Sequence, residues 1–165
     1  MQRQCVFIQG EADWCQQSAE TLLRGFESNK SIWLTAKSDK TEDSVSHKQA
    51  QSQLGKEYDL IVFDATEQFF PDSFGAIVGT LTAGGILVVL LTDHDSSLWS
   101  QRFKQVAQQY SQYKDFHYVR QGESLPPLSL LTQQHLNNNQ QYQNEDQRQA
   151  VAAILKVVHG HRRRP

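Results

Sequence analysis

Small or polar residues follow the buried strands that the sequence predicts. Asp64 ends the apolar run 60–64, Gly10 follows the first β-rich run, and Thr92 follows a later one. Because parallel strands end at the same edge of a sheet, we expect Gly10, Asp64 and Thr92 to border one crevice there. In open α/β sheets such a crevice is the usual binding place for a nucleotide or a related ligand.

Asp64 ends its strand as a Walker B aspartate does, and that aspartate holds the magnesium of a nucleotide site. This chemistry needs a phosphate loop earlier in the fold, and the sequence contains no G-x-x-x-x-G-K-[ST]. An aspartate at the end of a central strand is also common in open α/β sheets without that function. We therefore assign no catalytic residue and no metal ligand to the sequence.

Residues 58–91 also resemble the late strands of class I methyltransferases, with a strand ending in an acid, a helix, and a strand after Gly84 and Gly85. That family holds its methyl donor on a glycine-rich turn after the first strand. The turn 9–13 has one glycine and two acidic residues here, and no acid ends the run 31–35 to hold a ribose. A free-standing enzyme that binds a nucleotide or S-adenosylmethionine in the crevice is one alternative function.

The histidines and cysteines favour structural roles. The six histidines lack the HExxH spacing, and His94 lies between two aspartates in what we expect to be a solvated loop. The two cysteines, Cys5 and Cys15, are too few and too widely spaced for a disulfide framework or a zinc site. We expect both to be packing residues in a reducing cytoplasm.

The elements that position these residues alternate along the chain. Strands are expected at residues 4–8, 31–35, 59–64, 86–91 and 116–120. Helices are expected at residues 13–26, 47–54, from Pro71 to about 83–85, and 97–110, with a loop at 37–46. This alternation predicts a Rossmann-like α/β fold, an open and mostly parallel sheet with helices on both faces in three layers.

The composition changes near residue 126, and the C-terminal part differs from the rest. Residues 133–143 are rich in Gln and Asn and predict a linker. A final helix is expected from Asn144, with an apolar stripe that no following element covers, so we expect the chain to continue beyond Pro165. The predicted division is a domain at 1–135, followed by a linker and the first helix of another module at 136–165.

Gln147 begins a Q-x-x-A-V pattern at 147–151, which precedes the phosphate loop in superfamily 1 helicase-type ATPases. The glutamine amide reads the adenine edge in those proteins, because it donates and accepts hydrogen bonds together. Alternatively, Gln147 is only the third residue of a helix capped by Asn144.

Charge disfavours direct nucleic-acid binding by the domain, and hydropathy argues against a membrane partner. Residues 1–135 hold 11 Lys and Arg against 16 Asp and Glu, whereas residues 136–165 hold 5 against 2. An acidic domain is a poor surface for nucleic acid by itself. No apolar run approaches the roughly 20 residues of a membrane-spanning helix, so we expect no membrane partner.

Together these segments resemble the N-terminal region of the bacterial tRNA(Met) cytidine acetyltransferase family, described as a predicted P-loop ATPase fused to an acetyltransferase. The matching segments occur in order along the chain: 10–15, 54–57, 62–65, 79–84, 87–91 and 160–165. The resemblance covers nearly the whole chain.

The resemblance implies a multi-domain enzyme that uses ATP and acetyl-CoA to acetylate N4 of the wobble cytidine in elongator tRNA(Met). It makes residues 136–165 the start of a RecD-like helicase ATPase module and gives only Gln147 a ligand role, at the adenine of ATP. The 165 residues would then be a non-catalytic accessory domain without a cofactor of its own, which scaffolds the ATPase module or assists tRNA positioning. Its partners would be the downstream ATPase and acetyltransferase modules, and a pure protein-interaction module is a second alternative.

Overall fold

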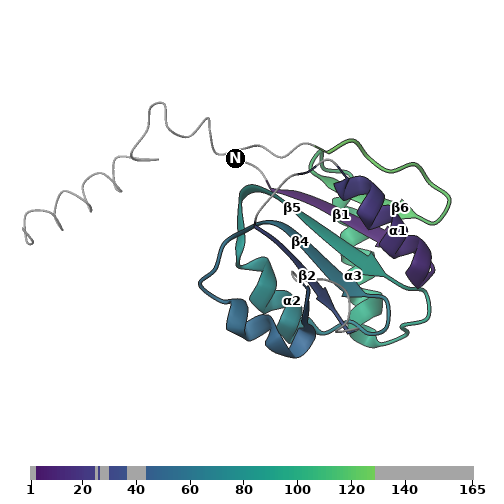
Figure 1. Ribbon diagram of the computed structural model, residues 1–165. Coiled ribbons are helices and arrows are strands. Elements are labelled where there is room, and N and C mark those ends of the chain that lie inside the picture. The colour runs from purple at the N-terminus through teal and green to yellow at the C-terminus, as the bar shows by residue number, and fades with distance from the viewer. Residues whose placement is uncertain (1–2, 25, 27–29, 37–43, 129–165) are drawn as a thin grey trace, which may run out of the picture. The chain divides into compact units, whose positions relative to one another are not determined.

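The computed structural model describes residues 3–24, 26, 30–36 and 44–128 (Figure 1). These residues build one six-stranded sheet with the order β3-β2-β4-β5-β1-β6, and every neighbouring pair is parallel. The strands are β1 (Gln4–Gln9), β2 (Ser31–Thr35), β3 (Ser44–Ser46), β4 (Tyr58–Ala65), β5 (Leu81–Leu91) and β6 (Phe116–Arg120). The helices are α1 (Ala12–Leu23), the 3-10 helix η1 (His47–Gln53), α2 (Pro71–Val78) and α3 (Leu98–Tyr110). They belong to a unit that spans Met1–Leu131.

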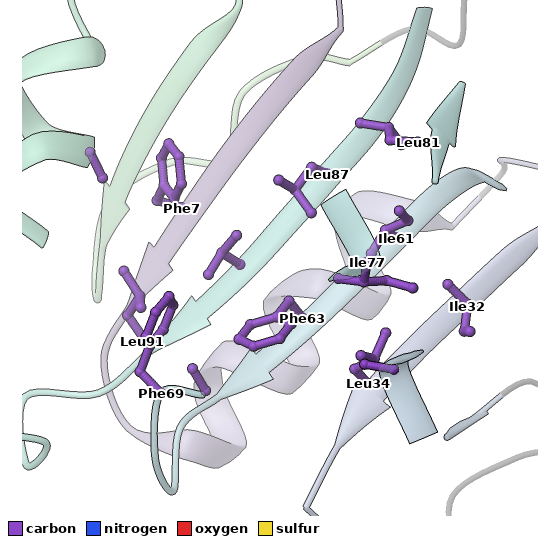
Figure 2. Close-up of a cluster of buried hydrophobic side chains, with 14 residues drawn as sticks. Phe7, Ile32, Leu34, Ile61, Phe63, Phe69, Ile77, Leu81, Leu87 and Leu91 are labelled. Carbon is purple, nitrogen blue, oxygen red and sulfur yellow. The ribbon is translucent and has the colours of Figure 1, made fainter. Parts of the chain in front are cut away.

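The sheet is covered on both faces, which confirms the predicted three-layer α/β fold. On one face, strand side chains such as Phe63 and Val89 form a core with Ile77 of α2 and Ala107 of α3 (Figure 2). The other core lies beneath α1. Because both faces are buried, β4 and β5 are apolar at consecutive positions, as the sequence pattern indicated.

The crossover connections place the polar residues at one edge. Parallel neighbours cannot be joined by a hairpin, and the helices α1, α2 and α3 lie in the chain between successive strands of this sheet. All strands therefore end on the same side, and Gly10, Asp64 and Thr92 lie at this carboxyl edge.

Residues 81–85 are strand, and the prediction that the helix from Pro71 continues to 83–85 was wrong. Helix α2 ends at Val78, and β5 begins at Leu81 beside Tyr58. The pairing of β4 and β5 shifts register between Tyr58 and Leu60, at the level of Gly84 and Gly85. Gly84 has φ +82°, so the two glycines form an irregularity within the strand and do not end a helix.

A short strand also lies inside the predicted loop at 37–46. Strand β3 pairs in parallel with β2 and forms one edge of the sheet. Three residues without a long apolar run give too weak a pattern for a sequence-based prediction. Residues 37–43 lie outside the described residues.

The predictions for the C-terminal part also lie outside the described residues. They are the domain boundary at 135, the linker, the helix from residue 144 and the ligand role of Gln147. In the described part of the chain, no helix has the length and apolar character needed to cross a membrane.

Two alanine substitutions test whether close packing fixes the β5 irregularity. A Cβ on Gly85 would lie 2.9 Å from the backbone oxygen of Asp59, whereas a Cβ on Gly75 of α2 would meet nothing within 4 Å. We expect Gly85→Ala to lower the free energy of unfolding by about 1–3 kcal/mol. Gly75→Ala should raise it by about 0.5–1 kcal/mol, because alanine favours the helix. Urea unfolding measures the free energy of unfolding of both variants. Equal effects of the two substitutions would contradict the interpretation that close packing fixes the irregularity in β5.

Candidate functional site

The structure brings Gly10 and Thr92 together at the carboxyl edge of the sheet. Their preceding residues Gln9 and Leu91 are register partners, and the Gly10 amide donates to the Leu91 carbonyl oxygen at 3.1 Å. Asp64 lies one strand further along the edge, in β4. The predicted crevice residues are therefore neighbours along one edge, and the contacts of each side chain decide what they can do.

Asp64 is buried, with 6% of its surface exposed, and the fold itself supplies its hydrogen-bond donors. Its Oδ2 accepts from Gln16 Nε2 and from Thr35 Oγ1, each at 3.2 Å. Its Oδ1 accepts from the Thr66 amide at 3.0 Å and from Thr66 Oγ1 at 2.6 Å. These donors come from α1, from the end of β2 and from the residue after β4, so the carboxylate joins three elements.

This arrangement does not fit a Walker B magnesium ligand. Such an aspartate directs an oxygen toward bound metal and phosphate, whereas both oxygens of Asp64 already accept two hydrogen bonds from protein groups. Among the described residues, no group of three or more His, Cys, Asp or Glu side chains is placed to hold a metal ion.

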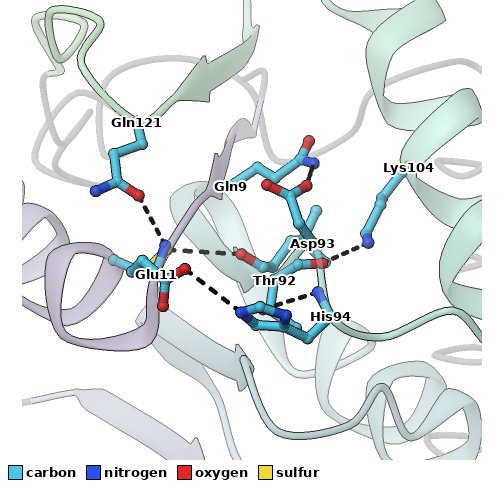
Figure 3. A network of polar contacts seen from close by, with 9 residues as sticks. Gln9, Glu11, Thr92, Asp93, His94, Lys104 and Gln121 are labelled. Carbon is cyan, nitrogen blue, oxygen red and sulfur yellow. Dashed lines mark hydrogen bonds and ion pairs between the residues drawn. The ribbon is translucent and has the colours of Figure 1, made fainter.

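The turn after β1 is closed by a side chain from the turn after β6 (Figure 3). The Glu11 amide, at the start of α1, donates to Gln121 Oε1 at 2.9 Å. A Cβ on Gly10 would lie 2.7 Å from the same oxygen and 2.9 Å from Trp14 Cε3. In dinucleotide-binding folds this turn brings its backbone close to a phosphate at the helix N-terminus. Here Gln121 Oε1 accepts the hydrogen bond from the Glu11 amide that a phosphate oxygen would accept in those folds.

The turn after β5 is also held by internal contacts (Figure 3). Gln9 Nε2 donates to Asp93 Oδ1, and the His94 amide donates to Thr92 Oγ1 at 3.2 Å. Lys104 Nζ reaches from α3 and donates to the Thr92 carbonyl oxygen. His94 is exposed, as expected for a solvated loop, and its Nε2 lies 3.4 Å from an oxygen of the exposed Glu11 carboxylate. An ion pair as exposed as this one contributes little to stability.

His47 is a buried polar residue at this edge that the sequence pattern did not single out. Its ring lies between Phe63 and Phe70, with 4.8 Å between ring centroids in both cases. Its Nε2 lies 2.8 Å from the Asp64 carbonyl oxygen, which only accepts, so Nε2 carries the proton. Nδ1 is then an acceptor, and it has no hydrogen-bond partner among the described residues. Ser46 and Gln49 cap the short helix, and their types and spacing carry no signal for the buried ring.

The two thiols have the packing roles predicted for them. Cys15 is buried, and burial, with the Asp64 carboxylate nearby, raises its pKa to about 12. Burial likewise raises the pKa of Cys5 to about 11. Neither thiol forms the thiolate that a nucleophile or metal ligand requires near neutral pH.

The family model described as "tRNA(Met) cytidine acetyltransferase TmcA, N-terminal" matches residues 1–121, well over half of the sequence. The chain belongs to this family. The match confirms the resemblance drawn from the sequence.

Curated TmcA proteins match over a similar region. The tRNA(Met) cytidine acetyltransferase of Nitrosococcus halophilus is 28% identical over 191 aligned positions, covering 99% of this chain and 26% of the relative. The TmcA of Vibrio cholerae is 29% identical, covering 96% of this chain and 22% of the relative. The TmcA of Haloferax volcanii is 30% identical over 61% of this chain. This TmcA N-terminal chain therefore spans about a quarter of the length of the first two relatives.

The buried His47 predicts a pH dependence of stability in this TmcA domain. Burial lowers the pKa of His47 below its ordinary 6.5, although the Asp64 carbonyl and nearby carboxylates act in the opposite direction. As the pH falls below about 6.5, the unfolded chain therefore binds a proton that the folded chain does not, and stability decreases. Above that pH the ring is neutral in both states, and the effect is absent.

Urea unfolding of wild type and His47→Gln between pH 5 and 8 measures this effect. The substituted glutamine keeps a donor for the Asp64 carbonyl but does not titrate, so the stability of this variant should fall less steeply below about pH 6.5. His94→Gln, at an exposed position, is the matched control for the change from histidine to glutamine. The same slope in His47→Gln and wild type would contradict a buried neutral imidazole.

Proposed function

We propose that this chain is a non-catalytic accessory domain of an ATP-dependent tRNA(Met) wobble-cytidine N4-acetyltransferase. The observation that carries the proposal is the closure of the carboxyl edge by the chain's own side chains. Gln121 Oε1 accepts a hydrogen bond from the Glu11 amide at the start of α1. The Asp64 carboxylate accepts hydrogen bonds from Gln16, Thr35 and Thr66. An edge held in this way supports the fold and offers little to a nucleotide.

ATP and acetyl-CoA act, in this proposal, in modules that follow the domain in the longer polypeptide. The relatives carry about three quarters of their length outside the matched region, which leaves room for such modules. The domain itself, extending over residues 1–135, needs no cofactor. Residues 136–165 form the linker and the first helix of the ATPase module, with Gln147 at the adenine of ATP.

The domain scaffolds the ATPase module and assists the positioning of elongator tRNA(Met) mainly through that module. The charge distribution supports this division, because residues 1–135 carry 16 acidic against 11 basic side chains. Repulsion from the phosphate backbone disfavours tight tRNA binding by this domain alone. A tRNA-modifying enzyme of this kind acts in the cytoplasm.

Calorimetric titration of the 165-residue chain with S-adenosylmethionine, ATP and acetyl-CoA separates this proposal from its rival. We expect no binding heat with any of the three and no ATP hydrolysis or acetyl transfer above a protein-free blank. Micromolar binding that is lost in Gln121→Ala or Asp64→Asn would contradict the accessory role. It would favour a free-standing nucleotide- or methyl-donor-binding enzyme.

A further inference from the structure

Large apolar side chains exposed to solvent gather on α3 and on the turn that follows it. Leu98, Trp99, Tyr110 and Tyr113 are 84%, 65%, 47% and 54% exposed. Among the described residues, Leu54 is the only other large apolar side chain in this class. Isolated exposed apolar residues are normal, but three on one helix and a fourth in the turn that follows it indicate an interaction surface.

The apolar residues of α3 form a stripe along one side of the helix. Trp99, Phe103, Val106 and Tyr110 follow the spacing i, i+4, i+7 and i+11, which places them on one face. Phe103 and Val106 are only half-buried. The Tyr110 ring lies beside the Tyr113 ring, with 5.6 Å between ring centroids, so the apolar surface extends into the turn after α3. We call Trp99, Val106, Tyr110 and Tyr113 the α3 stripe.

A pocket of about 190 Å³ lies beside the α3 stripe. Its walls are apolar or aromatic side chains of β1, α3 and β6: Phe7, Phe103, Val106, Ala107, Tyr110 and Phe116. Small-molecule sites usually measure about 300–1,000 Å³ and contain a few polar groups that orient the ligand. A smaller pocket without a charged group fits an apolar side chain of a protein partner better than a nucleotide or acetyl-CoA.

The start of α3 is held in place, so the stripe is presented on an ordered helix. Asp95 accepts from the Ser97 amide at 2.9 Å and from the Phe69 amide at 3.2 Å. Ser97 Oγ caps the helix by accepting from the Ser100 amide at 3.2 Å. A surface that is ordered before binding loses less conformational entropy in a complex.

The low charge of the α3 region favours a protein as its binding partner over RNA. From Leu98 to Tyr113 the sequence has no acidic residue and only two basic residues, Arg102 and Lys104. Lys104 Nζ already donates to the carbonyl oxygens of Thr92 and Asp95. Few charges, with exposed Trp and Tyr, are typical of the core of a protein interface, whereas RNA binding needs several cations for the phosphates.

We propose that the α3 stripe and its pocket are the surface on which another part of the TmcA polypeptide docks, by inserting an apolar side chain beside α3. The choice of partner follows from the comparisons, because the two relatives that match nearly the whole chain continue for about three quarters of their length outside this domain. This inference rests on the accessory role proposed above and assigns that role to one surface.

Binding in trans tests the surface. The 165-residue chain is titrated with the separately produced remainder of its TmcA polypeptide, and the dissociation constants of Trp99→Ser and Tyr110→Ser are compared with wild type. Because exposed aromatic anchors dominate interface energetics, we expect each variant to bind at least about tenfold more weakly. Leu54→Ser, on an exposed apolar residue outside the stripe, is the matched control and should bind as wild type does. Near-ultraviolet circular dichroism checks that each variant is folded.

Selective crosslinking gives a second measurement that leaves the stripe side chains Trp99 and Tyr110 unchanged. Cys5 and Cys15 have pKa values of about 11 and 12, so a cysteine introduced by Tyr113→Cys is the thiol labelled at pH 8. A photoreactive label there should crosslink to the remainder of the polypeptide, and the same label on Leu54→Cys should not.

The outcomes separate the two proposals. Wild-type affinity in Trp99→Ser and Tyr110→Ser, with no crosslink from position 113, would overturn the docking surface and leave the accessory role standing. Absence of any binding between wild type and the remainder would overturn the docking proposal. Loss of tRNA binding in Trp99→Ser, with unchanged binding to the remainder, would make the stripe an RNA contact and would also overturn it. Failure of the accessory role appears separately, as ligand binding in the calorimetric titration.

Discussion

Burial of a parallel sheet on both faces is the constraint on which the rest of this domain depends. β4 and β5 occupy the middle of the sheet, and nearly all their side chains are excluded from solvent. Such strands need a helical layer on each side, and the parallel direction requires that those layers come from the crossover connections. The polar groups that end the strands are thereby collected at one edge. At this edge a domain of this architecture either binds a ligand or satisfies its polar groups internally.

In this chain the polar groups around Gly10, Asp64 and Thr92 are satisfied internally, by groups that come from distant parts of the sequence, whereas Nδ1 of the neighbouring His47 has no partner among the described residues. Asp64 in β4 accepts hydrogen bonds from Gln16 of α1 and Thr35 of β2. Gln121, just after β6, accepts a hydrogen bond from the Glu11 amide just before α1. The same buried carboxylate in a nucleotide-binding relative of this fold would face metal and phosphate. Here it joins helix and strands, and the exposed apolar surface lies elsewhere, on α3. Both features favour a domain that acts through its neighbours in a longer polypeptide.

The elements of the sheet were predictable from the sequence because they depend on local pattern. The strands at 31–35 and 116–120 have the predicted bounds, and the buried run ending at Asp64 has the expected position. The irregularity at Gly84 and Gly85 was missed because a glycine pair after a helix also signals a helix end, and only the approach of the Asp59 backbone distinguishes the two cases. Similarly, Asp64 was recognised but its partners were not, because hydrogen bonds across 29 or 48 residues leave no trace in spacing. The burial of His47 depends on Phe63 and Phe70 from other elements, which a single-sequence pattern does not reveal.

The stability of Asp64→Asn, measured by urea unfolding with and without magnesium, tests most directly whether the carboxyl edge supports the fold or a ligand. If Asp64 is structural, its replacement by asparagine places an NH₂ donor against protein groups that also donate. The lost hydrogen bonds should then lower the free energy of unfolding by about 2 kcal/mol. Asp13→Asn, at an exposed position in α1, should change it by less than about 0.5 kcal/mol. Magnesium should leave the wild-type value unchanged. A variant as stable as wild type, together with stabilisation of the wild type alone by magnesium, would contradict the account and identify Asp64 as a ligand residue.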